Sequence, residues 1–79
     1  MLIEIEISST LHGLIPVSEK NLTRDQWEVP AGTHPGDILN WLSLAEVPTM
    51  LILNKEVVTE GAILMEGDIL RIFPLVSGG

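Results

Sequence analysis

The first residues alternate between two kinds of side chain: the isoleucines Ile3, Ile5 and Ile7 are separated by the acids Glu4 and Glu6. Successive side chains of a β-strand point to opposite faces of a sheet, so this pattern predicts a strand with one buried face and one exposed face. A single strand cannot bury that face alone. The rest of the chain must therefore supply neighbouring strands and a layer that covers the isoleucines.

Glycines and prolines divide the rest of the chain into short elements. A helix is predicted to begin near Thr33, whose hydroxyl can cap the first amides, and Pro35 suits an early helical position. Pro48 forces this helix to end by about Val47. Strands are predicted over 1–8, 22–29, 50–53, 56–59 and 69–73, with a loop over 9–21 that has room for one turn packed under the sheet. This order predicts an α+β fold in which one helix packs across a small mixed sheet.

Two apolar features are assigned to the interior. The run Met50–Leu53 has no alternation, which predicts a strand inside the sheet that is covered on both faces. Trp27 and Trp41 are interpreted as core residues rather than as a stacking platform for bases, because the chain is strongly acidic. Met50 and Met65 are likewise interpreted as ordinary core or hairpin residues.

The length of the chain limits what it can do. With 79 residues, of which 46% are apolar, it is predicted to form one domain over 1–79, with a folded body over 1–74 and a C-terminal tail over 75–79. A body of this size buries one thin core and holds no deep pocket between two lobes, which excludes most self-contained enzymes. The function is therefore expected to lie on the surface.

Acidic residues outnumber basic residues, eleven to four, and the net charge is -7. This charge repels phosphate backbones and anionic lipid headgroups, so neither nucleic acid nor a membrane is an expected partner. It favours encounter with a basic protein groove, although an acidic surface also serves solubility alone.

The chain has no cysteine, which excludes disulfides, thiolate metal sites and a cysteine nucleophile. His12 and His34 are far apart in the sequence and make no closed metal site, so no metal is expected. Apolar runs such as Met50–Leu53 are far shorter than the roughly 20 residues that span a bilayer, and the first residues do not resemble a secretion signal. We expect a cytoplasmic protein.

The tail ends in two glycines, Gly78 and Gly79. No side chain lies beside the terminal carboxylate, so the tail can enter a narrow channel of another protein, and fully extended it reaches roughly 16 to 18 Å. The carboxylate is ionised at neutral pH and resists nucleophilic attack until a partner activates it. Conversion to an acyl-adenylate would allow sulfide or a persulfide to displace the nucleotide and leave a thiocarboxylate. Ordinary tails also end in glycine, so this chemistry depends on the context of the motif.

Residues 64–79, LMEGDILRIFPLVSGG, resemble the end of the MoaD/ThiS sulfur-carrier family, in which a Gly-Asp turn feeds a final strand that runs into Gly-Gly. The alternating first strand and residues 30–33 and 51–55 extend this resemblance more loosely over the chain. The resemblance implies the ubiquitin-like β-grasp fold. It also implies that an E1-like enzyme of the MoeB/ThiF type uses ATP to adenylate Gly79, which is then thiocarboxylated, and that Gly78 is the family's penultimate glycine. The chain is then a carrier with no bound cofactor rather than an enzyme.

Within the family, the segment before the helix and the ending from Phe73 to Gly79 are more similar to MoaD, the small subunit of molybdopterin synthase, than to the thiamine carrier ThiS. The expected receiver of the sulfur is then the large subunit of molybdopterin synthase, and thiazole synthase is the receiver under the thiamine alternative. Leu75 stands where MoaD proteins commonly have a second proline, and the predicted helix is shorter than theirs, so the pathway stays open. Two further alternatives are a ubiquitin-like modifier, whose Gly79 forms an isopeptide bond with a lysine, and a plain binding module.

The last predicted strand offers a docking face. If Leu70 and Ile72 point into the core, alternation places Ile69, Arg71 and Phe73 on the opposite face. Phe73 is then exposed near the tail, unless it packs under its own loop. A large exposed apolar residue beside a reactive arm suits a protein interface, so we expect this face to dock the activating enzyme. The predicted partner-binding residues are Ile69, Arg71, Phe73, Pro74, Leu75, Val76 and Ser77.

Overall fold

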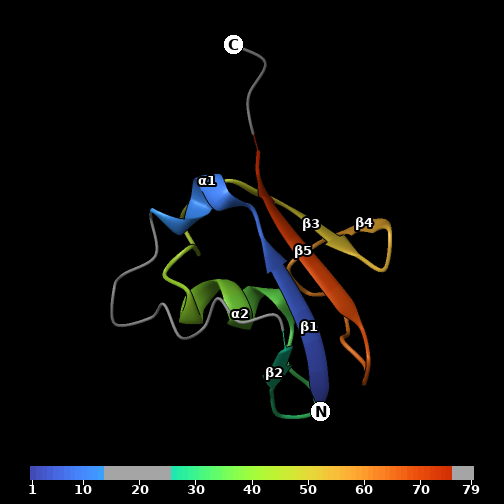
Figure 1. Cartoon of the computed structure of the whole chain (residues 1–79). Helices are drawn as coiled ribbons and strands as arrows, with labels where there is room; N and C mark the ends of the chain where they lie inside the picture. The colour runs from blue at the N-terminus through green and yellow to red at the C-terminus, as the bar shows by residue number, and fades with distance from the viewer. Residues whose placement is uncertain (14–25, 76–79) are drawn as a thin grey trace.

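The computed structural model describes residues 1–13 and 26–75, which form five strands and two short helices (Figure 1). In chain order the elements are β1 (Leu2–Ile7), α1 (Ser9–His12), β2 (Gln26–Glu28), α2 (Pro35–Trp41), β3 (Thr49–Leu53), β4 (Glu56–Val58) and β5 (Ile69–Pro74). The sheet order is β2-β1-β5-β3-β4, with β1 parallel to β5 and the other neighbouring pairs antiparallel. The predicted mixed sheet is confirmed, and the last strand lies at its centre beside the first.

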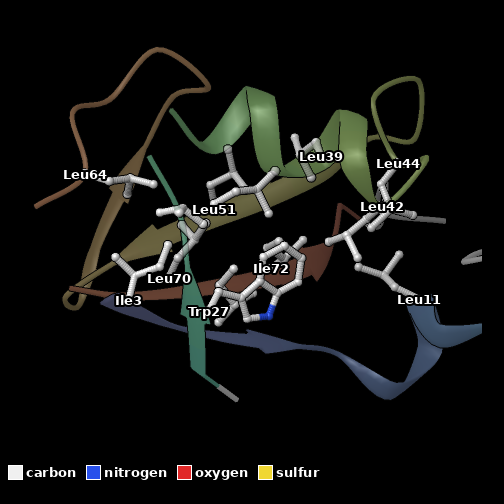
Figure 2. Packing of buried hydrophobic residues seen from close by; sticks show 13 residues of the cluster. Ile3, Leu11, Trp27, Leu39, Leu42, Leu44, Leu51, Leu64, Leu70 and Ile72 are labelled. Carbon is white, nitrogen blue, oxygen red and sulfur yellow. The ribbon is translucent and has the colours of Figure 1, made fainter. Parts of the chain in front are cut away.

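The alternation at the N-terminus produces the predicted half-buried strand. Ile3 and Ile5 of β1 are buried, whereas Glu6 is exposed on the other face. The layer that covers the isoleucine face is α2, and the core lies between α2 and the sheet (Figure 2). Ile38 from α2 and Ile72 from β5 are fully buried in this core. Each such side chain contributes roughly 1.5 to 3 kcal/mol by leaving water, so these contacts hold the two layers together.

The helix is shorter than the sequence predicts. It begins at Pro35 and ends at Trp41 instead of reaching Val47. At its start, the Asp37 carboxylate accepts a hydrogen bond from the backbone N–H of His34 at 3.0 Å. Thr33 does not cap the helix as predicted, because its hydroxyl donates to the carbonyl of Pro30 at 2.6 Å.

The early end of α2 has a backbone cause. Ser43 has a φ of 61°, which lies in the left-handed region and stops the right-handed helix well before Pro48. Leu44 nevertheless packs into the core, and its N–H donates to the carbonyl of Leu39 at 2.8 Å. The segment after the helix is therefore a set of turns that keeps one leucine buried.

The stretch predicted as a loop over 9–21 contains one turn of helix. This turn is α1, and its Leu11 belongs to the core, while residues 14–25 lie outside the described residues. The described part of the predicted second strand is β2, which forms one edge of the sheet. No helix in the described ranges is long and apolar enough to cross a membrane.

Of Trp27, Trp41 and Met50, Trp27 alone is buried. Trp27 is a core residue, as predicted, with 7% of its surface exposed. Trp41 stacks on it, with ring centroids 6.4 Å apart and planes inclined by 16°. Trp41 is 38% exposed, so its assignment to the core is wrong. Met50 is 37% exposed and lies in the β3–β4 hairpin rather than in the core. β3 does lie inside the sheet, but α2 covers only the face that carries Leu51, and the prediction of cover on both faces is also wrong.

Candidate functional site

The candidate site begins where β5 delivers the chain to the tail. β5 ends at Pro74, which is paired with Thr49, and the next residue, Leu75, donates its backbone N–H to the carbonyl of Pro48 at 3.0 Å. β5 pairs with β1 up to Ile72 and with β3 up to Pro74, so β3 holds the base of the tail. Val76, Ser77, Gly78 and Gly79, which carry the predicted chemistry, lie outside the described residues.

The alternation of β5 places its side chains as predicted. Leu70 and Ile72 have no exposed surface, whereas Phe73 is 38% exposed and Ile69 and Arg71 are half-buried. The three lie on the sheet face that points away from α2, which we call the outer face. The alternative in which Phe73 packs under its own loop does not occur. An exposed aromatic ring therefore stands one residue before the end of the strand that leads to the tail.

The outer face also contains apolar residues from β3 and β4 that the sequence analysis missed. Met50 lies opposite Phe73 in the register, Ile52 lies opposite Arg71, and Val57 lies opposite Ile52. Val57 is 72% exposed. The run Met50–Leu53 is apolar on both of its faces, so only its antiparallel pairing with β5 reveals which side chains are open to a partner.

The charged side of the outer face lies over β1. Glu6 is opposite Arg71 in the parallel pair of β1 and β5, and its Oε2 atom is 3.2 Å from the Nε atom of Arg71. Both side chains are partly exposed, so the pair contributes at most about 1 kcal/mol to stability. Its main effect is to fix the position of the Arg71 guanidinium. On one side of it lies the apolar strip, formed by the apolar outer-face residues of β5, β3 and β4, and on the other side lie the acids of β1.

A hydrogen-bonded turn holds the start of β5. Gly67 has a φ of 84°, a conformation that favours glycine. The carboxylate of Asp68 accepts hydrogen bonds from the N–H of Met65 at 2.7 Å and from the side-chain amide of Asn54 at 2.8 Å. The side-chain carbonyl of Asn54 in turn accepts a hydrogen bond from the backbone N–H of Ile69 at 3.0 Å. The Gly-Asp pair of the sequence motif thus fixes the point at which β5 begins and ties it to the β3–β4 turn.

The remaining candidate ligands do not form a metal centre in the described ranges, where no three His, Asp or Glu side chains are placed to hold an ion. His34 directs its Nδ1 atom to the carbonyl of Ala62 at 2.9 Å, which links α2 to the loop before β5. His12 lies at the end of α1. Around the base of the tail, the described site therefore presents exposed apolar side chains and the Glu6–Arg71 ion pair.

The arrangement of one helix across a mixed five-stranded sheet, with a parallel pair of first and last strands, defines the class as ubiquitin-like β-grasp. The crystal structure of SAMP1 from Haloferax volcanii has this fold, with a TM-score of 0.68 and 22% identity over 100% of both chains. The sequence model of the ThiS family matches residues 14–79, so the chain belongs to the ThiS family of ubiquitin-like sulfur carriers. No curated protein matches the chain.

Proposed function

We propose that this protein carries sulfur as a thiocarboxylate on Gly79. The family match supports the proposal because it continues through Gly78 and Gly79 to the end of the chain. The position of β5 supports it as well, because the central strand of the sheet leads directly to Leu75, which is 54% exposed. The main support for the proposal is therefore twofold: the family match includes the diglycine end, and the strand before the tail is paired within the sheet.

The proposed chemistry has two steps, both in the active site of a partner. A carboxylate oxygen of Gly79 attacks the α-phosphorus of ATP, and pyrophosphate leaves to give the acyl-adenylate. Sulfide then attacks the carbonyl carbon, and AMP leaves with the oxygen to give the thiocarboxylate. A persulfide can attack in place of sulfide if a thiol afterwards cleaves the S–S bond of the resulting acyl disulfide. The absence of side chains on Gly78 and Gly79 leaves the carbonyl carbon open on both sides. The chain is the substrate of an E1-like adenylating enzyme that uses ATP.

The outer face is the proposed docking surface for that enzyme. Phe73 and Met50 are neighbours there, and exposed aromatic and methionine side chains are enriched at protein interfaces. Ile69 and Arg71 extend the surface along β5, and Pro74 brings it to the base of the tail. Beyond Leu75, residues 76 and 77 are the proposed spacer that carries the two glycines into the partner's channel.

For the destination of the sulfur we propose the large subunit of molybdopterin synthase, with thiazole synthase as the alternative. The long segment before α2, which begins only at Pro35, and the ending from Phe73 to Gly79 favour the first. A shorter helix and Leu75, in place of a second proline, separate this chain from the common MoaD pattern. Leu75 has a backbone N–H that bonds to Pro48, and a proline at this position would have no N–H to donate.

The proposal is tested by ATP–pyrophosphate exchange with candidate E1-like enzymes, measured for the full chain and for a chain that ends at Gly78. Exchange with the full chain alone is expected. If the two chains support equal rates of exchange, or if neither supports exchange, the tail is not the acyl donor. The thiocarboxylated chain is then offered to molybdopterin synthase large subunit and to thiazole synthase, and the one that releases the carboxylate form identifies the pathway. Isopeptide bonds to lysines of other proteins would instead favour a modifier.

A further inference from the structure

The base of the tail borders a groove on the sheet side opposite to the outer face. We call it the exit groove; it lies between the segment that follows α2 and the β4 edge, and Leu75 forms one of its walls. Its apolar lining includes Val47, Leu51 and Val58, which are buried or half-buried. Its volume is about 400 Å³ and it is open to solvent. A space this open does not enclose a small molecule, but it accommodates a protruding side chain of another protein.

The length of the tail requires a partner to approach this groove. Gly79 is four residues beyond Leu75, and fully extended this stretch reaches roughly 13 to 14 Å. An enzyme that acts on the carboxylate of Gly79 must therefore lie against the surface around Leu75. That surface includes Phe73 on one side of the sheet and the exit groove on the other. A partner that surrounds the tail meets both.

The charge of the exit groove indicates what fills it. Glu46 and Glu60 both line it and both are exposed, and no lysine or arginine is among its lining residues. In the part of the chain that the structure describes, neither carboxylate has an ion-pair partner. A second hollow, lined also by Asp37, shares Ala45 and Glu60 with the groove and continues its acidic side along α2. An apolar lining beside carboxylates matches a side chain with an aliphatic stem and a cationic end.

We propose that the exit groove receives a lysine or arginine side chain of the adenylating enzyme, so that the enzyme grips the base of the tail from both sides of the sheet. This inference rests on the proposed function, because it requires an enzyme that acts on Gly79. The outer face supplies apolar contact, and the groove supplies a charged contact that fixes the direction in which the tail leaves the body. The cation is desolvated along its stem while its end stays paired with Glu46 and Glu60.

The test compares two double charge reversals in the adenylation assay. Glu46→Lys with Glu60→Lys places cations in the groove, and Glu28→Lys with Glu56→Lys makes the same change in net charge at exposed positions that do not line it. Loss of two partly exposed ion pairs is expected to raise the KM for the carrier about tenfold in the groove variant, with kcat nearly unchanged. The control variant is expected to stay within about twofold of the unsubstituted chain.

A third variant removes the influence of charge. Thr59 is exposed and lines the groove, so Thr59→Phe fills the groove with a bulky uncharged side chain. This variant is expected to raise KM while the dependence of KM on salt concentration stays unchanged. Circular dichroism checks that all variants keep the fold. If both double reversals raise KM equally, or if neither does, the groove is not the contact. If the unsubstituted chain is not adenylated by any candidate enzyme, the proposed function itself is wrong, and the groove inference is lost with it.

Discussion

The two faces of β5 are nearly equal in apolar content but differ in what covers them. On the inner face, Leu70 and Ile72 are fully buried beneath α2, whereas on the outer face Ile69 and Phe73 remain partly open. Within residues 1–13 and 26–75, the helical layer that the structure describes covers the inner face of the sheet, and the outer face of the central strand stays partly open. The same strand thus stabilises the body with one set of side chains and offers contact with the other.

The largest expected effect is on the inner face. Ile72→Ala removes a fully buried side chain from the centre of the sheet and leaves a cavity beneath α2. It is expected to lower the free energy of unfolding by about 2 to 5 kcal/mol, measured by urea denaturation. Val57→Ala, at a 72% exposed position on the outer face, is the control and should cost less than about 1 kcal/mol. Equal losses would mean that the two faces do not differ in structural role.

The next effect concerns the turn that sets where β5 begins. Asn54→Ala removes the hydrogen bonds to Asp68 and Ile69 and puts alanine at a φ of 50°. We expect a loss of about 1 to 2 kcal/mol in the same denaturation measurement. Asn40→Ala is the matched control, because Asn40 is exposed in α2 and has no described side-chain hydrogen bond. A loss no greater than that of the control would show that the turn does not fix β5.

A smaller effect on stability but a clear effect on function is expected at Phe73. Phe73→Ser should lower the free energy of unfolding by less than about 1 kcal/mol, while it raises the KM of the adenylating enzyme for the carrier about tenfold. Ile63→Ser tests whether any exposed apolar residue has this effect, since Ile63 is 74% exposed and lies in the loop before β5. Unchanged kinetics in Phe73→Ser would remove the outer face from the docking proposal.

The smallest effect is expected for the ion pair at the border of the apolar strip. Glu6→Gln removes the partner of Arg71, and because both side chains are partly exposed the stability should change by less than about 1 kcal/mol. The change should vanish at about 1 M salt, where such pairs are screened. A larger loss that persists at high salt would mean that Glu6 supports the fold through another contact.

The sequence predicts best where one physical rule acts alone. The alternation of β1, the buried and open sides of β5 and the exposure of Phe73 all follow from the two-residue period of a strand. The extent of α2 does not follow from local rules, because the left-handed turn at Ser43 ends it well before Pro48. A helix-forming composition does not reveal such a turn.

The candidate site was predictable along one strand but not across strands. Ile69, Arg71 and Phe73 are on one strand, and their alternation was enough to place them together. The run that contains Met50 is apolar at every position, so it predicts cover on both faces and does not single out Met50 as exposed. The place of Met50 beside Phe73 depends on the pairing of β3 with β5, which joins residues far apart in the chain. The exit groove depends on the same pairing and on the position of the segment after α2.

The most direct test of the account is the intact mass of the chain after incubation with an E1-like adenylating enzyme, ATP and sulfide. A chain that lacks Gly79 is treated in parallel. We predict a mass gain equal to the exchange of one oxygen for one sulfur in the full chain and no gain in the shortened one. An unchanged mass with an enzyme that thiocarboxylates another carrier of the family in the same mixture, or an equal gain in both chains, would contradict the central claim that Gly79 carries the sulfur.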